Sequence, residues 1–386
     1  MKIVKKIFFT FLSIVFLSIA GLYTTGHSYL LRGICSTYLV GEDSATITDK
    51  KYFSTRTVKA GEYIPWDISD TYKEKTLGTT LRSTLEKHES IAFLVLENGK
   101  IDYEEYWGIG SEESSTNSFS MAKTVVGMLA GSAMADNKIS NVFQPVTDFI
   151  PEWNGTNPDN PNLSSSSLQI RHLLTMSAGL EWDERYKSPF SVTTEAYYGN
   201  QIHELILGLN LDVEPGTKHF YQSCATQLLA MVIEKAVGKS LSEYASEKLW
   251  IPLGAKHDAD WHLDKEDGNE IAFCCFNSNA RDFARFGQLY LNKGNWYGKQ
   301  IIPEPYVDIS IEPSPNADWY GYGWWLVTKN GHDAYYMRGV NGQYVCVIPD
   351  MNIVFVRLGH DYGEKIGHHR ADFLTYLEEV IDMYQK

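Results

Sequence analysis

The chain has 386 residues and carries 48 acidic side chains against 34 lysines and arginines, a formal net charge of −14 at pH 7. This length can bury a large core, but the acidic balance argues against a nucleic-acid partner, because phosphate contacts need a basic face. The cysteines follow no metal-ligand spacing, and their odd, scattered number predicts no disulfide framework. They are Cys35, Cys224, Cys274, Cys275 and Cys346.

Residues 1–32 have the pattern of a targeting segment. Three lysines precede an apolar run over 7–23, and no further charge appears until Arg32. The run is long enough to span a bilayer and no clear cleavage site follows, so we favour an uncleaved anchor over a signal peptide or a buried helix. The lysines place the rest of the chain on the periplasmic or extracellular side. We expect membrane contact through this segment only, and secretion if it is cleaved.

Two strands and a buried helix are predicted between residues 90 and 135, after a stretch from 33 to about 88 that is hard to assign. The runs 90–97 and 100–107 flank Asn-Gly, the strongest short hairpin signal. The segment 118–135 is apolar or small on every face and ends in a polar tripeptide, which predicts a buried helix.

A Ser-x-x-Lys motif lies at the start of this helix. Lys123, its one charge, comes three residues after Ser120, so the two side chains share a helical face. The motif is typical of a serine nucleophile that a lysine helps to deprotonate. About one or two copies are expected by chance in a chain of this length, and a snorkelling surface lysine is the ordinary alternative. The apolar surroundings favour a catalytic role for Lys123, since burying a lone ammonium group costs free energy unless the group takes part in the chemistry or is paired.

From about residue 136 to 254 the chain is predicted to be mainly helical. A short helix is expected over 169–176 and a longer one over 223–237, where a glycine follows as the C-cap. Tyr221 therefore stands just before the mouth of the second helix.

The last third returns to sheet. After a helix over 279–291, strands are expected at 320–327, 335–348 and 352–358, and a C-terminal helix over 364–383. Strands near both chain ends and a helical middle predict an α/β (α+β) fold, with an antiparallel sheet flanked by helices and an inserted helical subdomain at about 136–254. We expect a single catalytic domain over 33–386.

The order and spacing of the motifs resemble the serine-reactive β-lactamase and penicillin-binding-protein superfamily. The likeness is to its class C-like branch, which includes 6-aminohexanoate-dimer hydrolases and carboxylesterases, and it runs from about residue 85 to the end. The motifs are Ser120-x-x-Lys123, Arg171–Leu180, Pro215-Gly216-Thr217, Tyr221-x-Ser223, Ala280–Gly287 and Gly339-x-x-Gly342-Gln343.

The resemblance implies a β-lactamase/transpeptidase-like fold and a division of roles at the site. Ser120 would be the acylated nucleophile, with Lys123 and Tyr221 as the base and acid. Free lysine and tyrosine titrate near pH 10, so they need mutual proximity and partial burial to act near neutral pH. The amides of Ser120 and of Val340 would hold the oxyanion.

Two departures from the family pattern bear on substrate choice. The Lys-Thr-Gly element of β-lactamases is absent, because the corresponding strand contains Arg338-Gly339-Val340-Asn341. Tyr221-Gln222-Ser223 stands where β-lactamases have Tyr-x-Asn. Tyr221-x-Ser223 resembles nylon-oligomer hydrolases better, although those enzymes carry His at the position of Asn341. Asn341 can still donate a hydrogen bond, so acyl transfer is compatible with the change.

We therefore expect a serine hydrolase of a small ester, amide or peptide substrate, with no cofactor and no metal. The alternatives are a penicillin-recognising cell-wall D,D-peptidase, a β-lactamase, and a non-catalytic binding module, against which the intact Ser120, Lys123 and Tyr221 argue. Other common hydrolase and nucleotide-binding motifs are missing from the sequence. Tyr186 and Trp325 are expected to wall the substrate pocket, with ordinary aromatic packing as the alternative.

Overall fold

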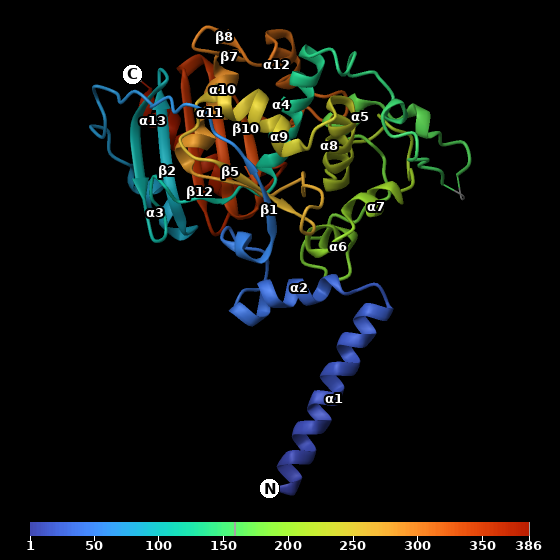
Figure 1. The fold of residues 1–386 in the computed structure, drawn as a ribbon. Coiled ribbons are helices and arrows are strands. Elements are labelled where there is room, and N and C mark those ends of the chain that lie inside the picture. Colours follow the sequence, from blue (N-terminus) through green and yellow to red (C-terminus); the bar gives the residue numbers. More distant parts are fainter. Residues whose placement is uncertain (158–159, 386) are drawn as a thin grey trace.

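The computed structural model describes residues 1–157 and 160–385 and contains a six-stranded antiparallel sheet (Figure 1). The strand order β3-β2-β12-β11-β10-β9 joins strands from both ends of the described chain, which confirms the predicted fold class. The strands are β2 Ser90–Glu97, β3 Lys100–Tyr106, β9 Trp325–Lys329, β10 His332–Gly339, β11 Gln343–Ile348 and β12 Ile353–Gly359.

Successive side chains of a strand point to opposite sides of a sheet, so each strand of this sheet presents side chains to both faces. Helices cover both of these faces. The covering helices are α3 Thr79–Lys87, α11 Ala280–Leu291 and α13 Ala371–Tyr384. On one face Gly287 of α11 lies so close to valines of β11 and β12 that a β-carbon would collide with them. On the other face Phe373 of α13 stacks on Tyr336, with ring centroids 3.7 Å apart. Both faces of the sheet are therefore core.

The region between 136 and 254 is mainly helical, as predicted, and lies beside the sheet (Figure 1). Its longest helix, α8, covers Ser223–Val237, and Gly238 ends it in the left-handed conformation. α8 packs against α4, Met121–Ala135, the helix expected after the first hairpin. The shorter helices are α5 Ile170–Leu174, α6 Val192–Tyr198, α7 Ile202–Leu207, α9 Leu241–Ala245 and α10 Ile251–Leu253.

A second, four-stranded sheet was not expected from the sequence. Its order is β1-β5-β6-β4, and β1 comes from the stretch that resisted assignment. The strands are β1 Ser54–Val58, β4 Thr116–Asn117, β5 Ala259–Leu263 and β6 Phe276–Ser278. β4 ends directly before the chain turns into α4, so this small sheet fixes where the Ser-x-x-Lys motif begins.

The C-terminal region departs from the prediction in three places. The single strand expected over 335–348 is two antiparallel strands, β10 and β11, which the bend over 340–342 separates. The strand expected from residue 320 begins only at Trp325, because a turn precedes it in which Gly323 has φ +80°. The C-terminal helix begins at Ala371 rather than 364. A small hairpin, β13 Lys365–Ile366 and β14 His369–Arg370, takes the place of its first turns, and Gly367 at φ +59° lies in the bend.

The other helices and strands lie at opposite ends of the molecule in Figure 1. α12 covers Glu304–Ser310, and β7 Asn295–Trp296 pairs with β8 Lys299–Gln300. α1, Lys2–Thr24, projects away from the rest of the chain, and α2, Tyr29–Ser36, connects it to the body (Figure 1). α1 has a mean hydropathy of 2.1 over its most apolar 18 residues, so it is long and apolar enough to cross a membrane.

Candidate active site

Ser120 lies at the start of α4, where a tight turn presents it to a cavity. Phe119 before it adopts φ +45°, a left-handed conformation that is unfavourable for a bulky residue. The Asn117 side-chain oxygen, which accepts a hydrogen bond from the Phe119 amide at 2.8 Å, holds this turn. The Ser120 side chain makes no capping hydrogen bond to the helix. The Ser120 hydroxyl therefore does not cap the helix.

Lys123 points back to Ser120, as the three-residue spacing predicts. Its Nζ donates to Ser120 Oγ at 3.0 Å and to the Phe273 carbonyl oxygen at 2.8 Å. The side chain is buried, and this burial lowers the pKa of the ammonium from 10.5 to about 8, although the Glu184 charge acts in the opposite direction. A large part of the lysine population is therefore neutral near pH 8 and able to accept a proton.

Tyr221 completes a triangle with these two residues. Lys123 Nζ lies 5.1 Å from the Tyr221 ring centroid. Burial raises the pKa of the Tyr221 phenol well above its usual value, and a hydrogen bond with the Ser120 side chain acts in the lowering direction. Tyr221 thus stays protonated at neutral pH, whereas Lys123 loses its proton more easily.

The cavity in front of Ser120 has a volume of about 380 Å³. Tyr221, Tyr186, Trp325 and Val340 line it, so the structure gathers these predicted residues around Ser120. Asn341 is not among the lining residues. It lies in the bend after β10 with φ +59°, and its side-chain amide donates to the Ala45 carbonyl oxygen at 3.3 Å. The structure therefore places its side chain away from the substrate space.

The end of β10 passes very close to the chain that leads into α4. A β-carbon at Gly339 would collide with the Ser118 carbonyl oxygen, so only glycine allows this approach. The bend that follows, over 340–342, brings Val340 to the cavity that Ser120 also lines. This arrangement is compatible with two backbone amides facing one substrate oxygen.

Glu184 is a site residue that the sequence did not single out, although it belongs to an aromatic and acidic segment. Its carboxylate accepts hydrogen bonds from the Ser223 amide at 2.7 Å, the Ser223 hydroxyl at 2.6 Å and the Trp182 indole at 2.6 Å. The Tyr186 phenol donates to it at 2.5 Å. Glu184 therefore ties the cavity wall to the start of α8, next to Tyr221.

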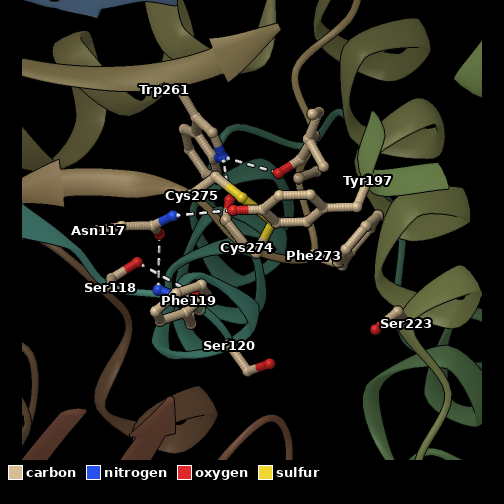
Figure 2. Close-up of a disulfide and its surroundings, with 12 residues drawn as sticks. Asn117, Ser118, Phe119, Ser120, Tyr197, Ser223, Trp261, Phe273, Cys274 and Cys275 are labelled. Atoms are coloured by element: carbon tan, nitrogen blue, oxygen red, sulfur yellow. Dashed lines mark hydrogen bonds between the residues drawn. A yellow bond between two sulfur atoms is a disulfide. The ribbon is translucent and has the colours of Figure 1, made fainter. Parts of the chain in front are cut away.

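Two adjacent cysteines next to the lysine partner form a disulfide, which the cysteine pattern did not predict. Figure 2 shows the Cys274–Cys275 bond directly after Phe273, whose carbonyl oxygen binds Lys123. Trp261 Nε1 donates to the Cys274 carbonyl oxygen at 2.8 Å, which fixes the same segment from the other side. Among the described residues, no group of three or more His, Cys, Asp or Glu side chains is arranged to hold a metal ion.

Solved structures with this architecture define the fold. The chain superposes with a TM-score of 0.70 and 22% identity on a Bacillus anthracis protein assigned as a 6-aminohexanoate-dimer hydrolase, covering 88% of this chain and 92% of that one. A family VIII carboxylesterase gives a TM-score of 0.62 at 16% identity over 83% of this chain and 99% of its own. The fold is that of the serine β-lactamases and penicillin-binding proteins.

The sequence comparison gives the family itself. The beta-lactamase family model matches residues 79–375, and the chain belongs to this family. A relative, the 6-aminohexanoate-dimer hydrolase of Paenarthrobacter ureafaciens, is 26% identical over 307 residues, which are 72% of this chain and 74% of that protein. The named relatives of this chain are mostly hydrolases, so hydrolysis is the activity class of the family.

Proposed function

We propose that the protein is a serine hydrolase that cleaves an ester or amide through an acyl-enzyme on Ser120. The observation that carries the proposal is the 3.0 Å hydrogen bond between Lys123 Nζ and Ser120 Oγ at the mouth of a cavity. Neutral Lys123 takes the Ser120 proton as the oxygen attacks the carbonyl carbon, and Tyr221 protonates the leaving group. The amides of Ser120 and Val340 stabilise the oxyanion, and water then releases the acid.

The named relatives support this choice among the alternatives. One relative is a hydrolase of the 6-aminohexanoate dimer, and a neighbour of the same fold is a carboxylesterase. The strand beside the site lacks Lys-Thr-Gly, which disfavours a β-lactamase. We further propose that α1 is an uncleaved membrane anchor, that residues 33–386 form the catalytic domain, and that this domain lies outside the cytoplasm.

Steady-state hydrolysis tests the proposal. The full-length protein in detergent should turn over p-nitrophenyl acetate and butyrate with saturation kinetics, and it should leave benzylpenicillin intact. Rapid penicillin cleavage would favour the β-lactamase alternative, and a lasting penicilloyl adduct the cell-wall peptidase. No turnover of any ester or amide would favour a binding module.

The pH dependence should report the neutral form of Lys123. Because burial holds its pKa at about 8 and the amine must be neutral to act, kcat/KM should rise about tenfold per pH unit below pH 8 and level off above it. Hydrolysis of a methyl or ethyl ester releases an acid, and the rate at which base must be added to hold the pH constant gives the rate of hydrolysis. This measurement needs no pH-sensitive chromophore. A rate that is flat between pH 6 and pH 9, at about constant fold stability, would contradict Lys123 as the base.

Removal of the Cys274–Cys275 disulfide should lower turnover. The bond lies directly after Phe273, whose carbonyl oxygen positions Lys123 Nζ, and small misplacements of reacting groups are costly. We expect kcat of the double variant Cys274→Ser/Cys275→Ser to fall by about tenfold or more, with a smaller change in KM. Cys35→Ser, which removes an exposed free thiol, is the control and should behave as the wild type. Equal kcat in all three proteins would refute the positioning role of the disulfide.

A further inference from the structure

A short connecting segment before β1, residues 45–49, runs through the interior beside the active site. Its Ile47 and Asp49 side chains are fully buried, whereas connecting segments ordinarily lie on the surface. The segment also precedes residues 79–375, which the family model matches, so that match assigns it no role. We call residues 45–49 the bracing segment.

The bracing segment holds Asn117 by its main chain and by its side chain. The Asn117 amide donates to the Ile47 carbonyl oxygen at 2.9 Å. Asn117 Nδ2 donates to Asp49 Oδ1 at 3.2 Å, and the Tyr197 hydroxyl donates to Asp49 Oδ2 at 2.6 Å. The Asp49 carboxylate therefore fixes one end of the Asn117 side-chain amide and is itself fixed by Tyr197.

The other end of this side-chain amide holds the turn before the nucleophile. Figure 2 shows Asn117 between Tyr197 and the turn of Phe119 and Ser120. Asn117 Oδ1 accepts from the Phe119 amide at 2.8 Å, and Phe119 has the unfavourable φ of +45°. The side-chain amide is planar, so fixing Nδ2 also fixes Oδ1. Two hydrogen bonds thus connect Asp49 to the turn that presents Ser120.

The first residue of the bracing segment contacts the opposite side of the site. The Ala45 carbonyl oxygen accepts from Asn341 Nδ2 at 3.3 Å. Asn341 has φ +59° and directly follows Val340, which lines the cavity. The Asn341 side chain therefore ties the bend after β10 to the bracing segment. The same segment thus contacts both backbone stretches whose amides are proposed to hold the oxyanion.

We propose that Asp49 is a positioning residue for Ser120, and that the bracing segment holds the amides of Ser120 and Val340 at their working separation. This inference rests on the proposed function and adds residues that act on the site from outside the cavity. Backbone amides stabilise an oxyanion best when they are already in place before the reaction. Because small misplacements of reacting groups slow the chemical step, loss of the brace should lower kcat and leave KM nearly unchanged.

Kinetics of the full-length protein in detergent at pH 8, with p-nitrophenyl butyrate, test the inference. Burial raises the pKa of the Asp49 carboxyl to about 6, and the hydrogen bonds with Tyr197 and Asn117 act in the lowering direction, so the group is ionised in this assay. Asp49→Ala should lower kcat, and the rate of fluorophosphonate labelling, by about tenfold. Asp49→Asn keeps an acceptor oxygen for Asn117 and should restore most of both rates.

A buried carboxylate elsewhere provides the matched control. Asp264 is also fully buried, and it accepts hydrogen bonds from the backbone amides of Ile202 and Asn269. Asp264→Ala should lower the melting temperature but keep the kcat of the folded protein. If Asp49→Ala shows the same behaviour, with a lower melting temperature and wild-type kcat, the inference is overturned and the hydrolase proposal stands.

Two further variants test the path and the second contact. Asn117→Ala should lower kcat, and adding Asp49→Ala should cost little more, because Asp49 acts through Asn117. Fully additive losses would contradict this path. Asn341→Gly keeps the positive φ accessible and removes the bond to Ala45, so kcat should fall severalfold. Wild-type kcat in Asn341→Gly would overturn the bracing role even if Asp49→Ala does not fold. Absence of all ester and amide turnover in the wild type would overturn both proposals.

Discussion

Lys123→Met is expected to lower kcat/KM for ester hydrolysis by about a thousandfold while the protein stays folded. Without the amine, no described group is placed to take the Ser120 proton, because Tyr221 keeps its own at neutral pH. Methionine has a similar length and carries no charge, so it removes the cost of burying an amine in an apolar helix. The melting temperature should not fall, since α4 packs through its apolar side chains.

The measurement is steady-state kinetics together with thermal unfolding of the same preparations. Lys138→Met is the matched control, because Lys138 follows the same helix but is exposed. It should keep wild-type kinetics. Activity within about tenfold of wild type in a folded Lys123→Met protein would exclude the lysine as the base.

Ser120→Ala should abolish turnover, with a loss of at least about four orders of magnitude in kcat/KM. The hydroxyl forms the covalent bond in the proposed reaction, and no other hydroxyl is hydrogen-bonded to Lys123 Nζ among the described residues. The fold should tolerate the change, because the Ser120 side chain does not cap α4.

A second serine of the same helix provides the comparison. Ser132→Ala removes a buried hydroxyl that bonds the Met128 carbonyl oxygen at 3.2 Å and does not line the cavity. This variant should retain turnover, with at most a modest loss of stability. Comparable losses in Ser120→Ala and Ser132→Ala would mean that helix integrity, rather than the nucleophile, explains the effect.

The sequence predicts those parts of the fold whose signals are local. α4 and α8 begin and end close to the expected residues because a continuous apolar pattern is followed by a polar or glycine stop. The first hairpin follows from Asn-Gly between two strand-like runs. β4 and β6, with two and three residues, are too short to show alternation, so the second sheet could not be recognised.

Other features depend on tertiary neighbours. The 365–370 hairpin lies directly before a helical pattern, and the left-handed Gly367 forms its bend. The Cys274–Cys275 bond could not be deduced from an odd number of scattered thiols. Arg338 and the 365–370 hairpin are about thirty residues apart in the chain and meet only when the hairpin docks on β10. The sequence thus predicts which residue types the site contains, but it does not predict that they line one cavity.

The most direct test of the central claim is intact mass spectrometry of the full-length protein after exposure to a fluorophosphonate. The account predicts a single stoichiometric adduct in the wild type, located on Ser120 by peptide analysis, and no adduct in Ser120→Ala. Labelling should be slow in Lys123→Met, because the nucleophile then lacks its base. An adduct that persists in Ser120→Ala, or no adduct in a folded wild-type protein, would contradict an acyl-enzyme on Ser120.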